Sequence, residues 1–250
     1  MAATWLDFWN GSHRIYVNAR HAEVHYAKLA ADFISLIPAP SAVVVDWGCG
    51  DAYNAEEIVA HAARLVLCDA APATLLRLRD RFGTRQRRID VVAPEALRAR
   101  YQGNVDLFVV NSVLQYLSDA ELDQLIADAR AALAPGGTLI IADVIPLRDD
   151  VLGDVRNLLR IGMRNGFFLA ALIGLVATFF SPYRRLRTTV GLKRYDEAAF
   201  LARLRAAGFD ARRMRPNLGF DQRRMAFTAT RPKGVAQSTA AAEPDRADQA

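Results

Sequence analysis

Two glycines and two acids stand at a spacing that could form a binding loop with a polar partner. Gly48 and Gly50 follow Asp46, and a second acid, Asp69, comes 21 residues after Gly48. Glycines let the backbone approach a ligand closely and adopt positive φ. A carboxylate at the distance of Asp69 can accept hydrogen bonds from both hydroxyls of a ribose. The pattern therefore predicts a ligand that contains a nucleoside, and a tight structural turn is the simpler alternative.

Two classes of cofactor use a glycine loop of this kind. Dinucleotides require a third glycine before the following helix, and here Tyr53 takes that position, where we expect it to crowd helix against strand. Asp46 and Asp51 would also repel a pyrophosphate, whereas they suit a cofactor that carries an ammonium and a sulfonium. The loop therefore favours S-adenosyl-L-methionine over NAD.

Strands and helices that alternate along the chain would position this loop. Strands are expected at 43–45, 64–69, 87–92, 105–111 and 138–143, and helices at 21–37, 54–63, 73–82 and 119–133. A helix at 196–207 and two strand-like runs at 211–215 and 225–230 follow. Branched apolar runs separated by helices are typical of a parallel sheet that is covered on both faces. We therefore predict an α/β fold, doubly wound, with a mostly parallel seven-stranded sheet.

The sequence resembles the class I S-adenosylmethionine-dependent methyltransferases of the small-molecule type over roughly residues 40–145 and 195–230. The segment Val43–Gly50 resembles their first motif, and Asp69 resembles their ribose-binding acid. Residues 105–117 resemble their fourth strand and the turn after it, and residues 133–141 resemble the loop before their fifth strand. The resemblance implies a Rossmann-like methyltransferase fold.

The resemblance also implies further contacts with the cofactor. Asp90 and Val91 would contact adenine, and Asp90 would accept from its amino group. Asn111 would lie beside the methionine part. In such enzymes a leading helix closes over the cofactor, so Tyr16 or Arg20 would reach its methionine carboxylate.

We expect four regions. They are an N-terminal helical lid at 1–37, the methyltransferase domain at 38–146 and 195–232, an apolar helical cap insertion at 147–194 after the fifth strand, and a disordered tail at 233–250.

Proton transfer during the reaction has only two candidate residues. The position after the fourth strand where small-molecule members often carry histidine is Gln115 here. His21 and His25 lie four residues apart and share a helix face. An ordinary partly buried face is their simplest interpretation, a base near the acceptor comes second and a metal ligand third, so no metal site is predicted.

The insertion and the overall charge bear on partners. Phe167–Phe180 carries no charge, and arginines and a lysine flank it between residues 156 and 194. This composition fits a buried cap, an apolar acceptor or a membrane surface. Because strands of one sheet precede and follow the insertion, we expect no transmembrane span, and peripheral membrane contact through 156–194 stays open.

The net charge of +5 admits nucleic acid as a partner, but the run Asn111–Leu114 lacks the prolines typical of base amino-group methylation. We see no appended RNA-binding module either, so nucleic acid is disfavoured.

Two cysteines and the absence of a signal-like start predict a cytoplasmic protein. The predicted function is methyl transfer to a small, partly apolar acceptor. A non-catalytic scaffold that retains the fold and a dinucleotide-dependent oxidoreductase are the alternatives.

Overall fold

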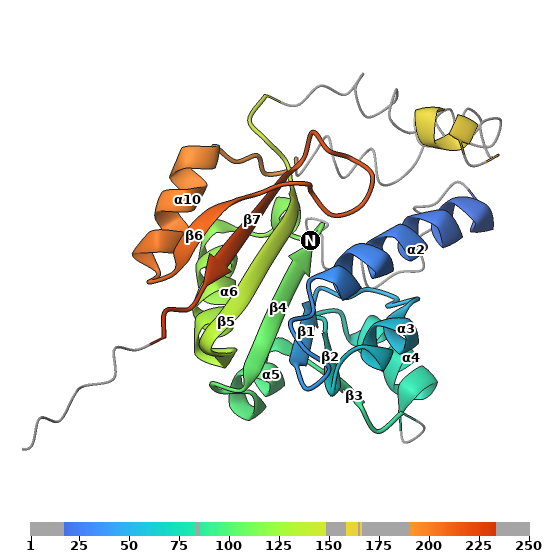
Figure 1. Cartoon of the computed structure of the whole chain (residues 1–250), viewed down its shortest axis with the longest axis horizontal. Coiled ribbons are helices and arrows are strands. Elements are labelled where there is room, and N and C mark those ends of the chain that lie inside the picture. Colours follow the sequence, from blue (N-terminus) through green and yellow to red (C-terminus); the bar gives the residue numbers. More distant parts are fainter. Residues whose placement is uncertain (1–17, 84–85, 149–158, 165, 167–190, 234–250) are drawn as a thin grey trace, which may run out of the picture.

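A twisted seven-stranded sheet with the order β3-β2-β1-β4-β5-β7-β6 forms the centre of the protein (Figure 1). The computed structural model describes residues 18–83, 86–148, 159–164, 166 and 191–233. The strands are β1 (Val43–Trp47), β2 (Arg64–Cys68), β3 (Ile89–Val92), β4 (Val105–Asn111), β5 (Leu133–Val144), β6 (Asp210–Met214) and β7 (Met225–Thr230). Strands β1 to β5 run parallel, and β7 runs antiparallel to both β5 and β6. The predicted fold is confirmed.

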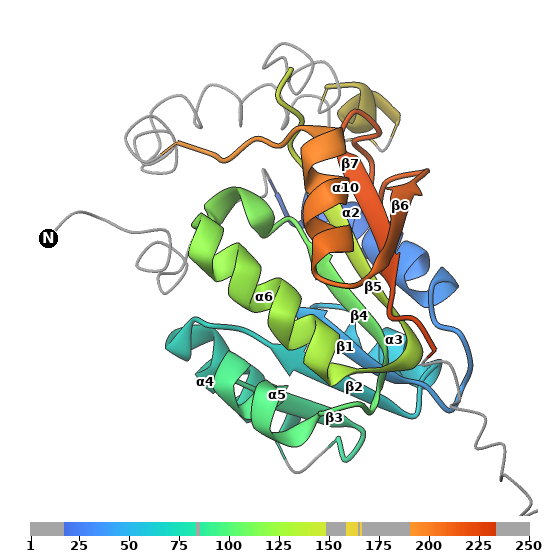
Figure 2. The same cartoon turned by 90° about the vertical axis from the view of Figure 1, so that its left-hand side faces the viewer.

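Helices cover both faces of the sheet (Figures 1 and 2). One layer holds α2 (Ala19–Ser35), α3 (Ala55–Ala60) and α4 (Pro72–Phe82), and the other holds α5 (Pro94–Arg100), α6 (Asp119–Ala132) and α10 (Glu197–Ala206). Each layer packs its own apolar cluster against the sheet. Side chains on both faces of the central strands are buried as a result, which explains why these strands read as continuous apolar runs.

Polar side chains fix where several helices begin. Ser118 and Glu121 form a reciprocal capping box at the start of α6, and Asp196 accepts from the backbone of Ala199 at the start of α10. Each cap satisfies amide groups that the helix leaves without a partner. Both helices begin within one residue of the prediction.

Two features differ from the sequence-based expectation. The helix α5 was not predicted, because it has seven residues and buries only Leu97. Strand β5 begins at Leu133, so Pro135–Gly137 are part of the strand rather than of a loop. The amide of Gly136 donates to Arg231 O, and the amide of Arg231 donates to Gly137 O, which extends the pairing beyond the predicted start.

The ends of the insertion lie together at the carboxyl end of β5. Pro146 and Tyr195 form a parallel bridge, the amide of Leu147 donates to Tyr195 O, and the amide of Tyr195 donates to Ile145 O. The chain therefore leaves and re-enters the domain at one point. Residues 159–164 are helical, and the apolar run 167–180 lies outside the described residues. Among the helices that are described, none has the length and apolar character needed to span a membrane.

Helix α2 belongs to the helical layer, because Ala30 and Phe33 are buried in the cluster shared with α3 and α4. The part of the predicted lid at residues 1–17 and the predicted tail at 234–250 lie outside the described residues. Strand β1 lies between β2 and β4, so the strand order reverses there. Ligands of open α/β sheets bind beyond the carboxyl ends of the strands at such a reversal.

Candidate functional site

The glycine loop is docked onto the end of strand β2. The amides of Gly48 and Cys49 donate to the carbonyl of Cys68 at 2.7 and 3.2 Å. Gly48 and Gly50 adopt φ values of 75° and 55°, a region that side chains other than glycine rarely enter. The loop therefore has a fixed conformation that depends on both glycines.

The two glycines serve different purposes. A Cβ on Gly48 would collide with Cγ2 of Val113, the second residue after β4, so this glycine lets the loop pack against the end of that strand. A Cβ on Gly50 would meet no described atom within 4 Å. The backbone at Gly50 therefore borders open space, as expected where a loop meets a ligand.

Asp69 lies at the centre of the predicted site. Its Oδ2 accepts from the amide of Gly50 at 3.0 Å, and its Oδ1 accepts from the amide of Ala71 at 2.8 Å. Burial raises the pKa of Asp69, and these two amides partly oppose that rise. Because each carboxylate oxygen can accept a second hydrogen bond, the side chain still offers two acceptors.

Asp46 brings a second carboxylate to the same place. Burial, and then the neighbouring charge of Asp69, raise the pKa of Asp46 to about 7. Two carboxylates held together at low solvent exposure attract a cation. This part of the site therefore suits a ligand with positive charge.

Three buried polar atoms around the loop have no hydrogen-bond partner among the described residues. They are Nε1 of Trp47, Oδ1 of Asn111 and Oε1 of Gln115, at the carboxyl ends of β1 and β4. Leaving a buried polar group unpaired costs roughly 1–3 kcal/mol. A ligand that offers a hydrogen-bond donor at Asn111 would remove part of that cost.

Helix α4 supports the far side of the loop. Arg77 pairs with Asp51 at 3.1 Å, and Arg81 donates to the carbonyls of Asp51 and Tyr53. Tyr53 is 53% exposed and packs on the ring of Tyr26, with 4.6 Å between ring centroids. The expected crowding by Tyr53 is therefore wrong, because its ring turns outward before α3 begins.

The residues predicted to contact adenine lie on β3. Asp90 accepts from Arg64 at 2.6 Å and from the hydroxyl of Tyr101, and it precedes the end of the strand by two residues. Val91 is partly buried against the α2–α4 cluster. The structure thus gives Asp90 protein partners and does not bring it to the glycine loop, and its contact with adenine stays a prediction.

The two histidines lie on α2 with their rings edge to face, 6.4 Å apart. Burial lowers the pKa of His21, and burial together with His21 lowers the pKa of His25 to about 4. Both rings are therefore neutral at pH 7. The described residues contain no cluster of three or more His, Cys, Asp or Glu side chains that could hold a metal. The role of His21 or His25 as a base stays a prediction. Tyr16, also predicted near the cofactor from this end of the chain, lies outside the described residues.

Sequence reasoning missed a polar group at the ends of β4 and β5. Ser112 donates to Asp143 at 2.7 Å, and the amide of Asp143 donates to Asn217 at 3.0 Å. The only signal for them in the sequence is that polar residues follow two apolar strands. Asn217 comes from the distant loop between β6 and β7, which no local pattern connects to β5.

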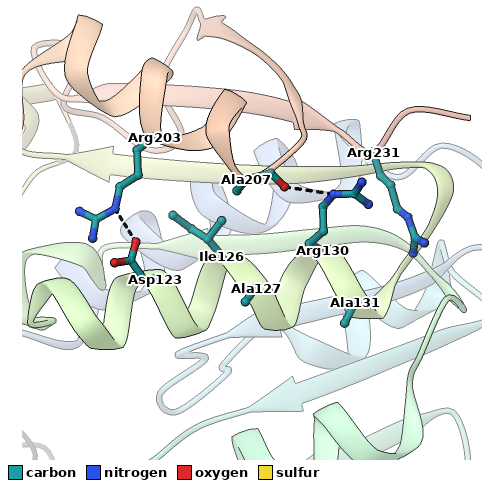
Figure 3. Close-up of a pocket in the computed structure, with 8 residues that line it drawn as sticks. All are labelled: Asp123, Ile126, Ala127, Arg130, Ala131, Arg203, Ala207 and Arg231. Carbon is teal, nitrogen blue, oxygen red and sulfur yellow. Dashed lines mark hydrogen bonds and ion pairs between the residues drawn. The ribbon is translucent and has the colours of Figure 1, made fainter.

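A cavity lies between α6 and α10, away from the glycine loop (Figure 3). Three arginines line it, and each already has a partner. Arg203 points to Asp123, Arg130 donates to Ala207 O, and Arg231 donates to Leu133 O. Two of these arginines join α6 to α10, and the third joins the chain after β7 to the start of β5, so they hold packed elements together and are not free to bind a ligand.

Comparisons with known proteins support the fold described above. Residues 44–137, from β1 into β5, match the family model described as a methyltransferase domain. This segment is therefore similar to a methyltransferase domain, and the sheet around it has the Rossmann-like methyltransferase fold. The predicted resemblance is confirmed.

Nodulation protein S from Rhizobium tropici is 29% identical over 135 residues, which are 54% of this chain and 53% of that protein. The match therefore spans about half the length of that relative.

Two solved structures are similar in fold. Phosphoethanolamine N-methyltransferase 1 from Haemonchus contortus, in complex with phosphoethanolamine and S-adenosylhomocysteine, has a TM-score of 0.62 and 16% identity, over 93% of this chain and 48% of that one. Magnesium protoporphyrin IX methyltransferase from Synechocystis PCC 6803, with bound SAH, has a TM-score of 0.54 and 14% identity, over 90% and 91%. At these identities the likeness concerns the fold.

Proposed function

We propose that this chain binds S-adenosyl-L-methionine over the carboxyl ends of β1, β2 and β4 and transfers its methyl group to a small, partly apolar acceptor. The observation that carries the proposal is the open space at Gly50 directly beside the carboxylate of Asp69. The match of residues 44–137 to a methyltransferase domain supports it.

The residues of the site fit the chemical groups of this cofactor. The two acceptor positions of Asp69 suit the two ribose hydroxyls, and the buried Oδ1 of Asn111 suits a donor from the ammonium group. The carboxylate of Asp46 balances positive charge on the ligand. When bound, the cofactor supplies an already activated methyl group, so the protein needs chiefly to orient the acceptor and exclude water.

The acceptor would enter next to the insertion. The described residues at the two ends of the insertion, 145–147 and 191–195, form its stem. The stem reaches the turn after β4, because the amide of Lys193 donates to Gln115 O and the hydroxyl of Tyr195 donates to Leu114 O. Residues 147–194 would cap the acceptor, and their basic flanks would allow contact with an anionic membrane. We place the protein in the cytoplasm, with that contact as a peripheral one.

Replacing Asp69 tests the cofactor site. Asp69→Ala should weaken S-adenosylmethionine binding by about 10-fold or more in isothermal titration calorimetry, because a hydrogen bond to a charged acceptor contributes roughly 1.5–3 kcal/mol. Asp80→Ala removes an exposed acid from the neighbouring α4 and is the matched control, expected to bind as the wild type does.

Equal binding by the wild type and Asp69→Ala would remove Asp69 from the site. Titration of the wild type with NADH tests the oxidoreductase alternative, because we expect no heat of binding for a dinucleotide.

A further inference from the structure

Two neighbouring strand ends adopt a backbone conformation that is uncommon for residues other than glycine. Ser112 follows β4 with φ 60°, and Asp143 lies near the end of β5 with φ 57°. The residues just before them, Asn111 and Ala142, are paired in the sheet, so the two unusual positions are side by side. Such backbone strain persists only where the surroundings enforce it, and it is concentrated at functional positions.

Two buried amide side chains enforce these conformations. Nε2 of Gln115 donates to the carbonyl of Ser112 at 2.8 Å, and Oδ1 of Asn217 accepts from the amide of Asp143 at 3.0 Å. Gln115 is 7% exposed and Asn217 is 4% exposed. Burial of an amide is costly unless it is well paired, and both are used to hold the backbone of this pair.

The side chains of the pair form one polar unit. Nδ2 of Asn111 donates to Oγ of Ser112 at 3.2 Å, and that hydroxyl donates to Oδ2 of Asp143 at 2.7 Å. The side chain of Asp143 is 30% exposed, so an incoming ligand can reach it. A carboxylate accepts hydrogen bonds and donates none, and it repels another anion.

The position of Asp143 connects the proposed cofactor loop with the stem of the insertion. Val113, which follows Ser112, packs directly against Gly48 of the loop. Ile145 and Leu147, just after Asp143, hydrogen-bond to Tyr195 in the stem. Asp143 therefore lies between the place proposed for the methyl donor and the segment proposed to cover the acceptor.

A structural ion pair is the simpler explanation for Asp143. Nε of Arg224 is 3.9 Å from Oδ1 of Asp143, but it is nearer to Asp221, at 3.6 Å. Asp221 thus provides a closer carboxylate for the same guanidinium. An ion pair with Arg224 also does not explain why two buried amide side chains hold Ser112 and Asp143 at positive φ.

We propose that Asp143, oriented by Ser112, binds the N–H or O–H group of the methyl acceptor, so that the acceptor is an amine or a hydroxyl compound and not a carboxylic acid. This inference rests on the proposed function. The carboxylate would select and orient the acceptor group and thereby bring its lone pair toward the methyl donor.

The experiment measures transfer of tritium from methyl-labelled S-adenosylmethionine to three compounds that share one apolar body: phenethylamine, 4-ethylphenol and 3-phenylpropionate. We expect labelling of the amine or the phenol and none of the carboxylate, and the first two arms identify which group is used. Asp143→Asn should raise the KM for the labelled compound about 10-fold, while the Kd for S-adenosylmethionine stays unchanged in calorimetry. Asp221→Asn removes the other carboxylate at Arg224 and should stay within about twofold of the wild type.

Preferential labelling of the carboxylate, equal KM values in the two variants, or normal cofactor binding without transfer to the amine or the phenol would each overturn the inference. Absence of S-adenosylmethionine binding by the wild type would instead overturn the proposed function itself.

Discussion

Asp46 has an unusual protonation equilibrium that determines how the site responds to pH. Its pKa is raised to about 7 in the folded protein by burial and by Asp69, against an ordinary value near 4 in an unfolded chain. The folded state therefore binds this proton more tightly than the unfolded state does. The contribution of Asp46 to the free energy of unfolding is greatest below about pH 4 and is lost as the pH rises to about 7.

Cofactor binding should reverse this protonation. A cationic ligand favours the ionised carboxylate, so affinity for S-adenosylmethionine should fall as the pH drops through about 7, with proton release on binding at pH 6–7. Asp46→Asn should abolish that proton release and raise the free energy of unfolding of the unliganded protein at pH 8 by about 1–2 kcal/mol. Calorimetry in two buffers of different ionisation enthalpy measures the protons. Identical release by the wild type and the variant would exclude Asp46 as their source.

Gly48 and Gly50 should respond differently to the same substitution. Gly48→Ala combines positive φ with a collision at Val113 and should lower the free energy of unfolding by about 2–4 kcal/mol. Gly50→Ala meets no described atom and should cost only about 1–2 kcal/mol from its φ, while it reduces cofactor affinity more strongly. Urea denaturation and calorimetry separate the two effects. Equal losses of stability would contradict the distinct roles assigned to the two glycines.

At this scale the sequence indicated the residues whose type is unusual and missed those whose conformation is unusual. Glycines and acids next to an apolar run are visible in the sequence, so Asp46, Gly48, Gly50 and Asp69 were chosen and lie around one loop. Ser112 and Asp143 have ordinary residue types. They differ from other residues only in their positive φ values and in the hydrogen bonds that their backbones form with buried amide side chains. The hydrogen-bond partners of Asp90 could not be predicted from the sequence either, because Arg64 and Tyr101 are distant in the chain.

The helices and strands that the sequence predicted are those with strong burial signals. Strands β2 and β4 bury most of their side chains and β1 buries Val44 and Val45, so their apolar runs were clear in the sequence. Helix α5 has one buried residue and gave no periodic pattern. The early start of β5 depends on pairing with Arg231, 94 positions after Gly137 in the sequence, and no local pattern contains that information.

The described ends of the insertion are joined to each other at the carboxyl end of β5, which allows its role to be tested separately from folding. Because Pro146 bridges Tyr195, residues 149–190 can be replaced by a short glycine-serine linker without separating the strands on either side. This variant should unfold within about 1 kcal/mol of the wild type, since the core of the domain lies outside the replaced segment, and should bind S-adenosylmethionine normally. It should lose methyl transfer if the segment caps the acceptor. Full transfer by the linker variant would contradict the cap.

The same variant tests contact with a membrane. Wild-type protein should sediment with phosphatidylserine vesicles at low salt and less at high salt, and the linker variant should remain in solution. Sedimentation of neither protein would leave the segment as a cap alone.

For the whole molecule, the order of the strands explains how distant residues form one site. The reversal of strand order between β2, β1 and β4 brings Asp46, Asp69 and Asn111 to the same edge, although they are spread over 66 residues. The alternation of strands and helices in the sequence predicted a doubly wound sheet, and such a sheet contains a reversal of this kind. The contribution of the β6–β7 loop, which brings Asn217 to Asp143, required the structure.

Hydrogen–deuterium exchange with and without S-adenosylhomocysteine tests the central claim most directly, because it reports both binding and its location. We expect slower exchange in peptides that cover residues 46–53, 68–72 and 110–116, with exchange in α10 unchanged and no effect of NADH. Unchanged exchange around the glycine loop, slower exchange confined to the cavity between α6 and α10, or protection by NADH alone would contradict it.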